Sequence, residues 1–160
     1  MARRTSSGEL PVKLLSEGPE ETFRIGYSLG KRLKKGDTVC LFGDLGSGKT
    51  TFVKGIASAL GIAERDITSA SFTIISEHTG TVDDVPVPLY HIDLYRLRGP
   101  DELDSLGVEE YIGRDGISVI EWAERLERVE DSVSVTLDIV GDEKREIVIR
   151  GVDETDWHHL

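Results

Sequence analysis

The chain has 160 residues, a length that suits one domain with a core of its own. Its 19 Lys and Arg against 30 Asp and Glu give a net charge of −11, which argues against direct binding of DNA or RNA, since such binding needs clustered cations. The single cysteine excludes a disulfide framework and favours the cytoplasm. Without a membrane-length apolar run or a signal peptide, we expect no membrane association.

The predicted elements begin after a flexible N-terminus over residues 1–9. A short strand at 12–15 precedes a helix that starts at Pro19, with acidic residues in its first turn that suit the helix dipole. An apolar, β-branched run at 38–42 predicts a buried strand. Apolar side chains at helical spacing follow over 52–60, so a helix is expected there.

The middle of the chain predicts a pair of strands, one entered through residues 67–75 and one over 87–94. A loop tip at 80–84 joins them, and this short connection favours an antiparallel pair. Residues 101–112 are rich in acids and predict one or two short helical turns. Another short helix is expected within 122–128.

Three strands are predicted in the last part of the chain. Residues 117–121 form an apolar run that ends in a carboxylate. Apolar and polar residues alternate over 133–139, which predicts a half-buried strand with a hairpin partner at 147–149. We therefore expect one domain over residues 10–150 and a flexible C-terminal tail over 151–160.

Residues 43–50 carry the spacing G-x-x-x-x-G-K-[ST], the signature of a phosphate-binding P-loop. Glycines let the backbone bend around an anion and aim its N–H groups at it, and the following helix adds its N-terminal N–H groups. Lys49 is expected on the β- and γ-phosphates and Thr50 on Mg²⁺. Because a predicted strand precedes the motif and a predicted helix follows it, we expect a nucleoside triphosphate to bind.

The chain contains no asparagine and no glutamine. A guanine-reading Asn-Lys-x-Asp motif is therefore impossible, and so is a water-orienting glutamine of the Ras type. These absences favour adenine as the base, and hence ATP.

Two strand-end carboxylates compete for the metal. P-loop enzymes commonly place an acid at the end of a second strand, where it holds Mg²⁺ directly or through water. We assign Glu121 to the metal and Asp93 to a supporting role, near the metal or on the attacking water. A surface cap is the alternative for each. His91 is expected to be structural, with proton transfer as the alternative, and Trp122 is expected in the core or over the site.

Four motifs together resemble those of the TsaE (YjeE) family, small bacterial P-loop ATPases needed for threonylcarbamoyladenosine modification of tRNA. They are Gly-Asp-Leu-Gly-Ser-Gly-Lys-Thr-Thr at 43–51, Ser-Ala-Ser-Phe at 69–72, His-Ile-Asp-Leu-Tyr-Arg at 91–96 and Glu-Trp at 121–122. The resemblance covers about residues 22–149. One motif departs from the family pattern, in which residues 69–72 would read Ser-Pro-Thr-Phe.

The resemblance implies an α/β fold of the P-loop NTPase type with three layers. Its mixed sheet would have a parallel nucleotide-binding centre and flanking antiparallel strands. The implied catalytic residues are Lys49, Asp93 and Glu121, and the implied metal ligands are Thr50 and Glu121. The implied nucleotide-binding residues are Gly43, Asp44, Leu45, Gly46, Ser47, Gly48, Lys49, Thr50, Thr51 and Trp122.

The resemblance also implies a partner, the TsaB–TsaD pair, whose turnover ATP hydrolysis would support while tRNA is met only indirectly. Such an ATPase is expected to need Mg²⁺, to depend on its partner and to be slow alone. A stand-alone small-molecule or nucleotide kinase is the alternative, although its only candidate lid, residues 99–115, is mostly acidic. A module that binds ATP without hydrolysing it is a further alternative.

Overall fold

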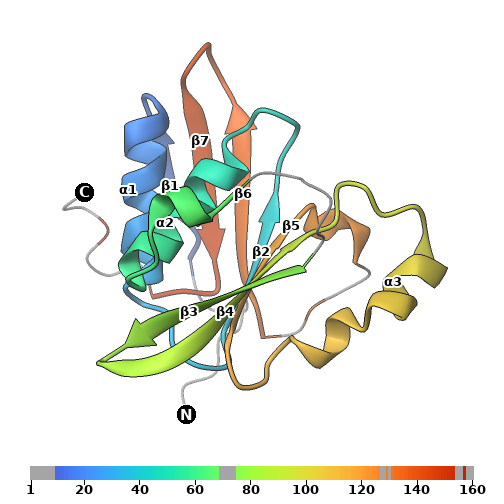
Figure 1. The fold of residues 1–160 in the computed structure, drawn as a ribbon. Helices are drawn as coiled ribbons and strands as arrows, with labels where there is room; N and C mark the ends of the chain where they lie inside the picture. Colours follow the sequence, from blue (N-terminus) through green and yellow to red (C-terminus); the bar gives the residue numbers. More distant parts are fainter. Residues whose placement is uncertain (1–9, 69–74, 127–128, 130, 154–156, 158–160) are drawn as a thin grey trace.

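The structure is a computed structural model that describes residues 10–68, 75–126, 129, 131–153 and 157. Its elements, drawn in Figure 1, are β1 (Val12–Ser16), α1 (Pro19–Gly30), β2 (Thr38–Phe42), α2 (Lys49–Ala59), η1 (Glu64–Asp66), β3 (Ile75–Val82), β4 (Val85–Asp93), α3 (Pro100–Leu106), η2 (Val108–Glu110), β5 (Ile117–Glu121), η3 (Ala123–Arg125), β6 (Val133–Ile139) and β7 (Arg145–Arg150). No helix among these residues is long and apolar enough to cross a membrane.

The strands form one seven-stranded sheet in the order β1-β7-β6-β2-β5-β4-β3. The four central strands β6, β2, β5 and β4 are parallel, and the pairs at both edges are antiparallel. The strand that feeds the P-loop, β2, lies at the middle of this order. The predicted mixed sheet with a parallel centre and antiparallel flanks is therefore confirmed.

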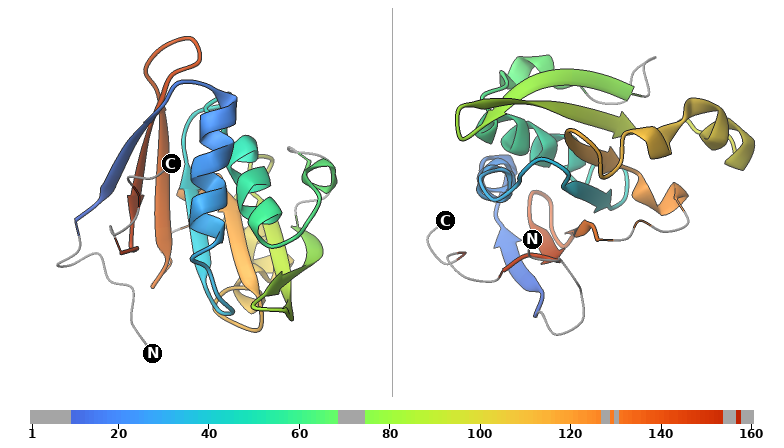
Figure 2. Two further views of the ribbon diagram at one scale, coloured as in Figure 1. Left: turned by 90° about the vertical axis from the view of Figure 1, so that its left-hand side faces the viewer. Right: turned by 90° about the horizontal axis from the view of Figure 1, so that it is seen from below.

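Helices α1 and α2 lie side by side on one face of the sheet (Figure 2). Their backbones approach closely because glycines face the contact. A Cβ on Gly26 would lie 2.3 Å from the carbonyl oxygen of Phe52, and one on Gly55 would lie 2.1 Å from that of Phe23. A large buried apolar cluster fills the space between the helices and the sheet, and it includes Leu29 and Ile56.

A second, smaller apolar cluster covers the opposite face of the sheet. Ile92 and Ile120 contribute to it from β4 and β5, and Leu97 and Val108 from the segment that connects those two strands. Helix α3 lies on this side, away from α1 and α2 (Figure 1). Apolar clusters on both faces give the sheet a covering on each side, which confirms the predicted three-layer arrangement.

The β3–β4 hairpin is longer than predicted. The expected loop at 80–84 shrinks to Asp83 and Asp84, both at positive φ (51° and 65°), because β3 continues in register with β4 up to Val82. A two-residue loop of this kind matches the twist of the paired strands. Pro86 and Pro88 precede Leu89, where the pairing of β4 with β5 begins, so neither ring breaks that ladder.

The packed core extends past residue 150. Val152 and Trp157 belong to the large cluster, and the guanidinium of Arg32 lies 4.2 Å from the centre of the Trp157 ring. The indole N–H donates to the carbonyl oxygen of Asp153. These two residues, which lie within the predicted tail over 151–160, pack against the domain, where the indole of Trp157 has a partner for its N–H.

Candidate functional site

The P-loop follows β2 and leads into α2, as predicted. Gly43 has φ 152°, and a Cβ there would lie 2.6 Å from Ser47 Oγ and 2.7 Å from the carbonyl oxygen of Leu137. Gly48, at φ 103°, is the N-cap of α2. At Gly43 a side chain is excluded because there is no space for it, and at Gly48 a side chain is disfavoured by the positive φ. The loop can therefore curl closely enough to turn backbone N–H groups toward an anion.

Lys49 is buried at the start of α2, with 5% of its surface exposed. Its ammonium donates to the carbonyl oxygens of Gly43 and Asp44, the second at 3.1 Å, and lies 4.0 Å from the centre of the Trp122 ring. Burial lowers the pKa of this lysine, and the nearby carboxylates, Glu121 foremost, oppose that shift. The carboxylates thus favour the charged form that phosphate binding requires.

Thr50 and Glu121 come together although they are 71 residues apart in the chain. The Thr50 hydroxyl lies 3.1 Å from Glu121 Oε1 and donates to it. The other carboxylate oxygen, Oε2, lies 2.5 Å from His91 Nε2. Glu121 is 2% exposed, so this carboxylate is held between a hydroxyl and an imidazole out of bulk water. His91 thus lies where it can orient the acid, and the contact is compatible with both roles considered for this histidine.

Asp93 ends β4 directly beside Glu121, since the two residues are partners in the β4–β5 register. Its carboxylate accepts a hydrogen bond of 3.0 Å from the backbone N–H of Tyr95. Burial raises the pKa of Asp93, the Tyr95 N–H opposes that rise, and the negative charge of Glu121 adds to it. Two neighbouring acids at the C-terminal ends of parallel strands face the P-loop lysine.

These residues enclose one cavity of about 390 Å³. Its lining consists of Leu45, Gly46, Ser47, Gly48, Lys49, Thr50, Thr51, Asp93, Tyr95, Glu121 and Trp122. Every residue predicted for the site is among them except Gly43 and Asp44, whose carbonyl oxygens bind Lys49 instead. Arg96 and Arg98, the two arginines soon after Asp93 in the chain that could neutralise charge in a transition state, are exposed and are not among the lining residues.

The donor set suits phosphate and Mg²⁺. Ser47 Oγ, in the P-loop, is buried and has no hydrogen-bond partner among the described residues, so it is a polar atom that an oxyanion would satisfy. Within the described part of the chain, three or more His, Cys, Asp or Glu side chains nowhere gather as a metal cage. Mg²⁺ commonly takes one or two protein oxygens and completes its shell with phosphate and water, and Thr50 with Glu121 offers that number.

Arg145, at the start of β7, is a site residue that the sequence did not reveal. Its Nε and one Nη donate to the carbonyl oxygens of Ser47 and Gly46, both at 3.1 Å. The other Nη donates to carbonyl oxygens of the β6–β7 turn, including that of Gly141 at 3.2 Å. The bond to Ser47 fixes the peptide that also carries the Gly48 N–H, and it does so from 98 residues away.

Comparison with known proteins shows which family has this arrangement of residues. The family model described as "Threonylcarbamoyl adenosine biosynthesis protein TsaE" matches residues 16–147. The chain belongs to the TsaE family. The matched range holds the P-loop, both acids, Trp122 and Arg145, so the whole cavity falls within it.

Similar proteins of known name support this membership. A Bacillus subtilis protein named tRNA threonylcarbamoyladenosine biosynthesis protein TsaE is 40% identical over 143 residues, which cover 88% of this chain and 86% of that protein. A Treponema pallidum protein of the same name is 38% identical, over 86% of this chain and 99% of its own length. The crystal structure of Bacillus subtilis YdiB has a TM-score of 0.70 and 36% identity, and covers 89% of this chain and 86% of its own.

The family motifs predicted from the sequence meet around the cavity, with one exception. Tyr95 comes from the motif at 91–96 and Trp122 from the Glu-Trp pair, and their ring centres lie 5.1 Å apart. Trp122 has a positive φ of 59°, the conformation that turns the chain at the end of β5. The motif Ser-Ala-Ser-Phe at 69–72 lies outside the described residues.

Proposed function

We propose that this chain is a Mg²⁺-dependent ATPase of tRNA threonylcarbamoyladenosine biosynthesis, a subunit whose ATP hydrolysis supports turnover of a TsaB–TsaD transferase complex. The observation that carries the proposal is the single cavity in which the P-loop lysine meets the hydrogen-bonded Thr50–Glu121 pair. Membership of the TsaE family supports the pathway.

Each residue has a part that its surroundings support. The P-loop N–H groups and the N-terminus of α2 bind the phosphates, and Lys49 adds a positive charge. Thr50 and Glu121 would hold Mg²⁺, which when bound neutralises charge on the phosphates and orients them. Asp93 lies beside Glu121 and accepts a proton or orients the attacking water. Trp122 covers Lys49 and shields it from bulk water.

The charges around the cavity favour slow hydrolysis by the isolated chain. Among the described residues that line it, Lys49 is the one cation and stands against two carboxylates. Phosphoryl transfer commonly depends on an arginine that neutralises the transition state and that a partner can supply. We therefore propose a partner-dependent rate. The single cysteine suits a cytoplasmic protein. The net charge of −11 suits a protein that docks on an enzyme and leaves tRNA to its partners.

The kinase alternative has less support from the site. A lid over residues 99–115 would need cations to clamp phosphate, whereas α3 begins with Asp101 and Glu102 in its first turn. The test that separates the two functions is phosphoryl transfer to small acceptors without any partner protein. A kinase would phosphorylate an acceptor, and an ATPase subunit would release inorganic phosphate.

The deciding experiment measures phosphate release by the wild type and Glu121→Gln, alone and with TsaB–TsaD. We expect the complex to raise the wild-type rate and the variant to lose roughly two to three orders of magnitude of it, the usual scale for one electrostatic group. Glu146→Gln, at an exposed position of β7, is the matched control and should keep the wild-type rate. A wild-type rate indifferent to the complex would refute the proposed role.

A further inference from the structure

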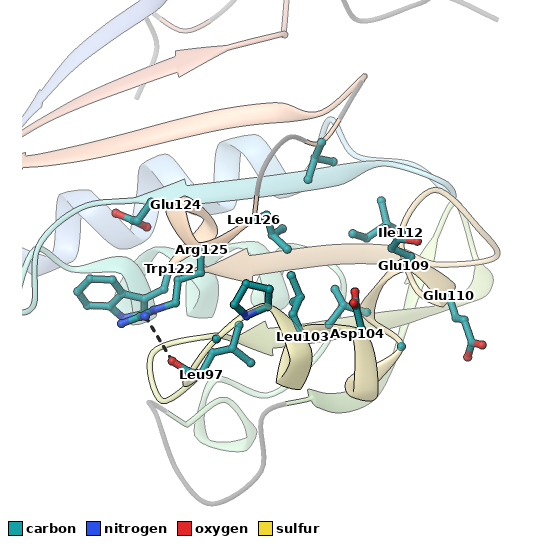
Figure 3. A pocket seen from close by; sticks show the side chains of 15 residues that line it. Leu97, Leu103, Asp104, Glu109, Glu110, Ile112, Trp122, Glu124, Arg125 and Leu126 are labelled. Atoms are coloured by element: carbon teal, nitrogen blue, oxygen red, sulfur yellow. Dashed lines mark hydrogen bonds between the residues drawn. The ribbon is translucent and has the colours of Figure 1, made fainter.

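A second and larger cavity lies beside the nucleotide site, on the α3 side of the sheet. This α3 groove has a volume of about 850 Å³, against about 390 Å³ for the nucleotide cavity. One wall is α3 with η2, and the other is formed by Trp122, Glu124, Arg125, Leu126 and Val129. In Figure 3, Leu97 and Leu103 lie on one side of the groove and Leu126 and Ile112 on the other. Apolar side chains therefore line both sides of the groove.

The α3 wall is only partly packed against the domain. None of the seven residues of α3 is buried. Leu103 and Leu106 are half-exposed and touch the edge of the smaller apolar cluster, while Val108 beyond them is buried in it. The wall therefore has an anchored end and keeps apolar surface open to the groove, which a binding partner could cover.

Carboxylates dominate the edges of the groove. Its described lining includes Asp104, Glu109, Glu110 and Glu124, against one cation, Arg125. That arginine already donates to the carbonyl oxygen of Leu97 at 3.3 Å. Residues 99–113 hold five acidic residues and no Lys or Arg. An occupant with positive charge around an apolar centre would complement this groove.

Trp122 connects the groove to the nucleotide site, since it lines both cavities. It lies at one end of the groove in Figure 3. Within the nucleotide cavity its ring lies over the Lys49 ammonium and beside Tyr95. An occupant of the groove would therefore touch the residue that covers the P-loop lysine.

We propose that the α3 groove docks a segment of a protein partner in which Lys or Arg residues flank large apolar side chains. Docking there lets the partner sense the nucleotide site through Trp122. A second copy of this chain is a poor occupant, because its own net charge of −11 opposes approach to an acidic groove. Only the identification of the partner as TsaB–TsaD rests on the proposed function.

The first test uses two synthetic peptides with the same Leu-Trp centre, one flanked by Lys and one by Glu. NMR of the full chain should show the Lys-flanked peptide shifting signals of Leu103, Leu126 and Trp122, with at least tenfold tighter binding than the Glu-flanked peptide. Shifts spread over other acidic surfaces, or equal binding of both peptides, would overturn the proposal. A binding stoichiometry of two chains per peptide would also overturn it, in favour of a dimer face.

Two double variants with the same change in net charge show whether peptide binding depends on the groove or only on the acidic surface as a whole. The variant Asp104→Lys/Glu109→Lys should weaken the Lys-flanked peptide at least tenfold. Glu64→Lys/Glu77→Lys makes the same change in net charge at exposed positions that do not line the groove, and should change binding less than twofold. ATP affinity should stay within twofold of wild type in both. Equal weakening by the two variants would count against a groove-specific site.

The second test uses the TsaB–TsaD complex in place of peptides alone. If the complex is the partner, it should displace the Lys-flanked peptide, and the groove variant should lose most of the partner-stimulated hydrolysis while the control variant keeps it. Peptide binding in the groove without any response to TsaB–TsaD would sustain the groove and reject the proposed function. If the wild type bound no Lys-flanked peptide and TsaB–TsaD fully stimulated the groove variant, the function would be sustained and the groove rejected.

Discussion

Glu121, which we propose as a ligand of Mg²⁺, shows how the fold holds a single carboxylate in place. Thr50 and His91 hold its two oxygens from different elements, at 3.1 Å and 2.5 Å. A carboxylate held in this way loses little side-chain freedom on binding, since its rotamer is already fixed. The cost is that several polar and charged groups, including Lys49 and Asp93, are buried together.

Asp93 is predicted to lower stability at neutral pH. Because burial raises its pKa above the ordinary value of 3.8, the folded chain keeps the proton at pH values where the unfolded chain has released it. Stability therefore falls as pH rises from the ordinary pKa through the raised one. Without Mg²⁺ and nucleotide, Asp93→Asn should have a melting temperature a few degrees higher near neutral pH. In a domain of this size, each kcal/mol added to the free energy of unfolding raises the melting temperature by roughly 2–4 °C.

The same variant keeps an oxygen for the Tyr95 N–H, so the loop should stay folded. Thermal melts at acid and neutral pH check the prediction, and the difference from wild type should vanish below the ordinary pKa. Hydrolysis should fall in the same variant. An unchanged or lower melting temperature at neutral pH would show that the carboxylate is not destabilising.

At the scale of elements, the α1–α2 contact is predicted to tolerate no side chain at Gly55. Its added Cβ would lie 2.1 Å from the Phe23 carbonyl oxygen and 2.8 Å from the Tyr27 backbone nitrogen. Gly55→Ala should lower the free energy of unfolding by about 3 kcal/mol, the upper part of the range for overpacking, despite the helix propensity of alanine. Gly99→Ala is the control, because its Cβ would meet nothing within 4 Å. Urea unfolding of both variants measures the difference.

Arg145 is predicted to be a positioning residue for the P-loop. Arg145→Met keeps the aliphatic length but loses the donors to Gly46 and Ser47, so the Kd for ATP should rise roughly tenfold, about the effect of one charged hydrogen bond. Arg145→Lys should recover part of the affinity, since an ammonium can replace one bond but not the fork. Calorimetric titration with ATP is the measurement.

Arg150→Met, at an exposed position of the same strand, should leave ATP affinity unchanged. If Arg145→Met lowered the melting temperature while leaving the Kd at the wild-type value, the arginine would be a structural link between hairpin and loop and no more.

Local patterns predicted most elements but not how distant elements meet. The P-loop, β2 and α2 carry a motif with short-range spacing, β6 carries strict alternation, and β7 is a short apolar run after a turn, so all of these could be found in the sequence. The pairing of β1 with β7 brings together strands from opposite ends of the chain at one edge of the sheet, and no short-range pattern encodes it. The hydrogen bonds from Arg145 to the P-loop could not be predicted for the same reason. The burial of Trp157 was not predicted because the residues beside it in the sequence are polar, although its own side chain is buried.

At the scale of the whole molecule, charge predicts that the isolated chain binds tRNA poorly. A net charge of −11 offers few cations for phosphate and repels the polyanion. At about 0.1 M salt we expect no saturable binding of tRNA by the chain alone, and recovery of tRNA with the chain only when TsaB–TsaD is present. Filter binding with and without the complex measures this. Tight, salt-sensitive binding by the chain alone would contradict the expectation.

The close backbone contact of α1 with α2 has a consequence for how the molecule opens. Helix α2 cannot separate from α1 without exposing much of the larger core, so its amide hydrogens should exchange only when the whole domain unfolds. Helix α3, with no buried residue, can unfold locally at a small part of that free energy. The proposed nucleotide site thus lies between a helix that opens only with the whole domain and a helix that can unfold on its own. A change at the nucleotide would therefore alter the structure of α3 at a lower free-energy cost than that of α2.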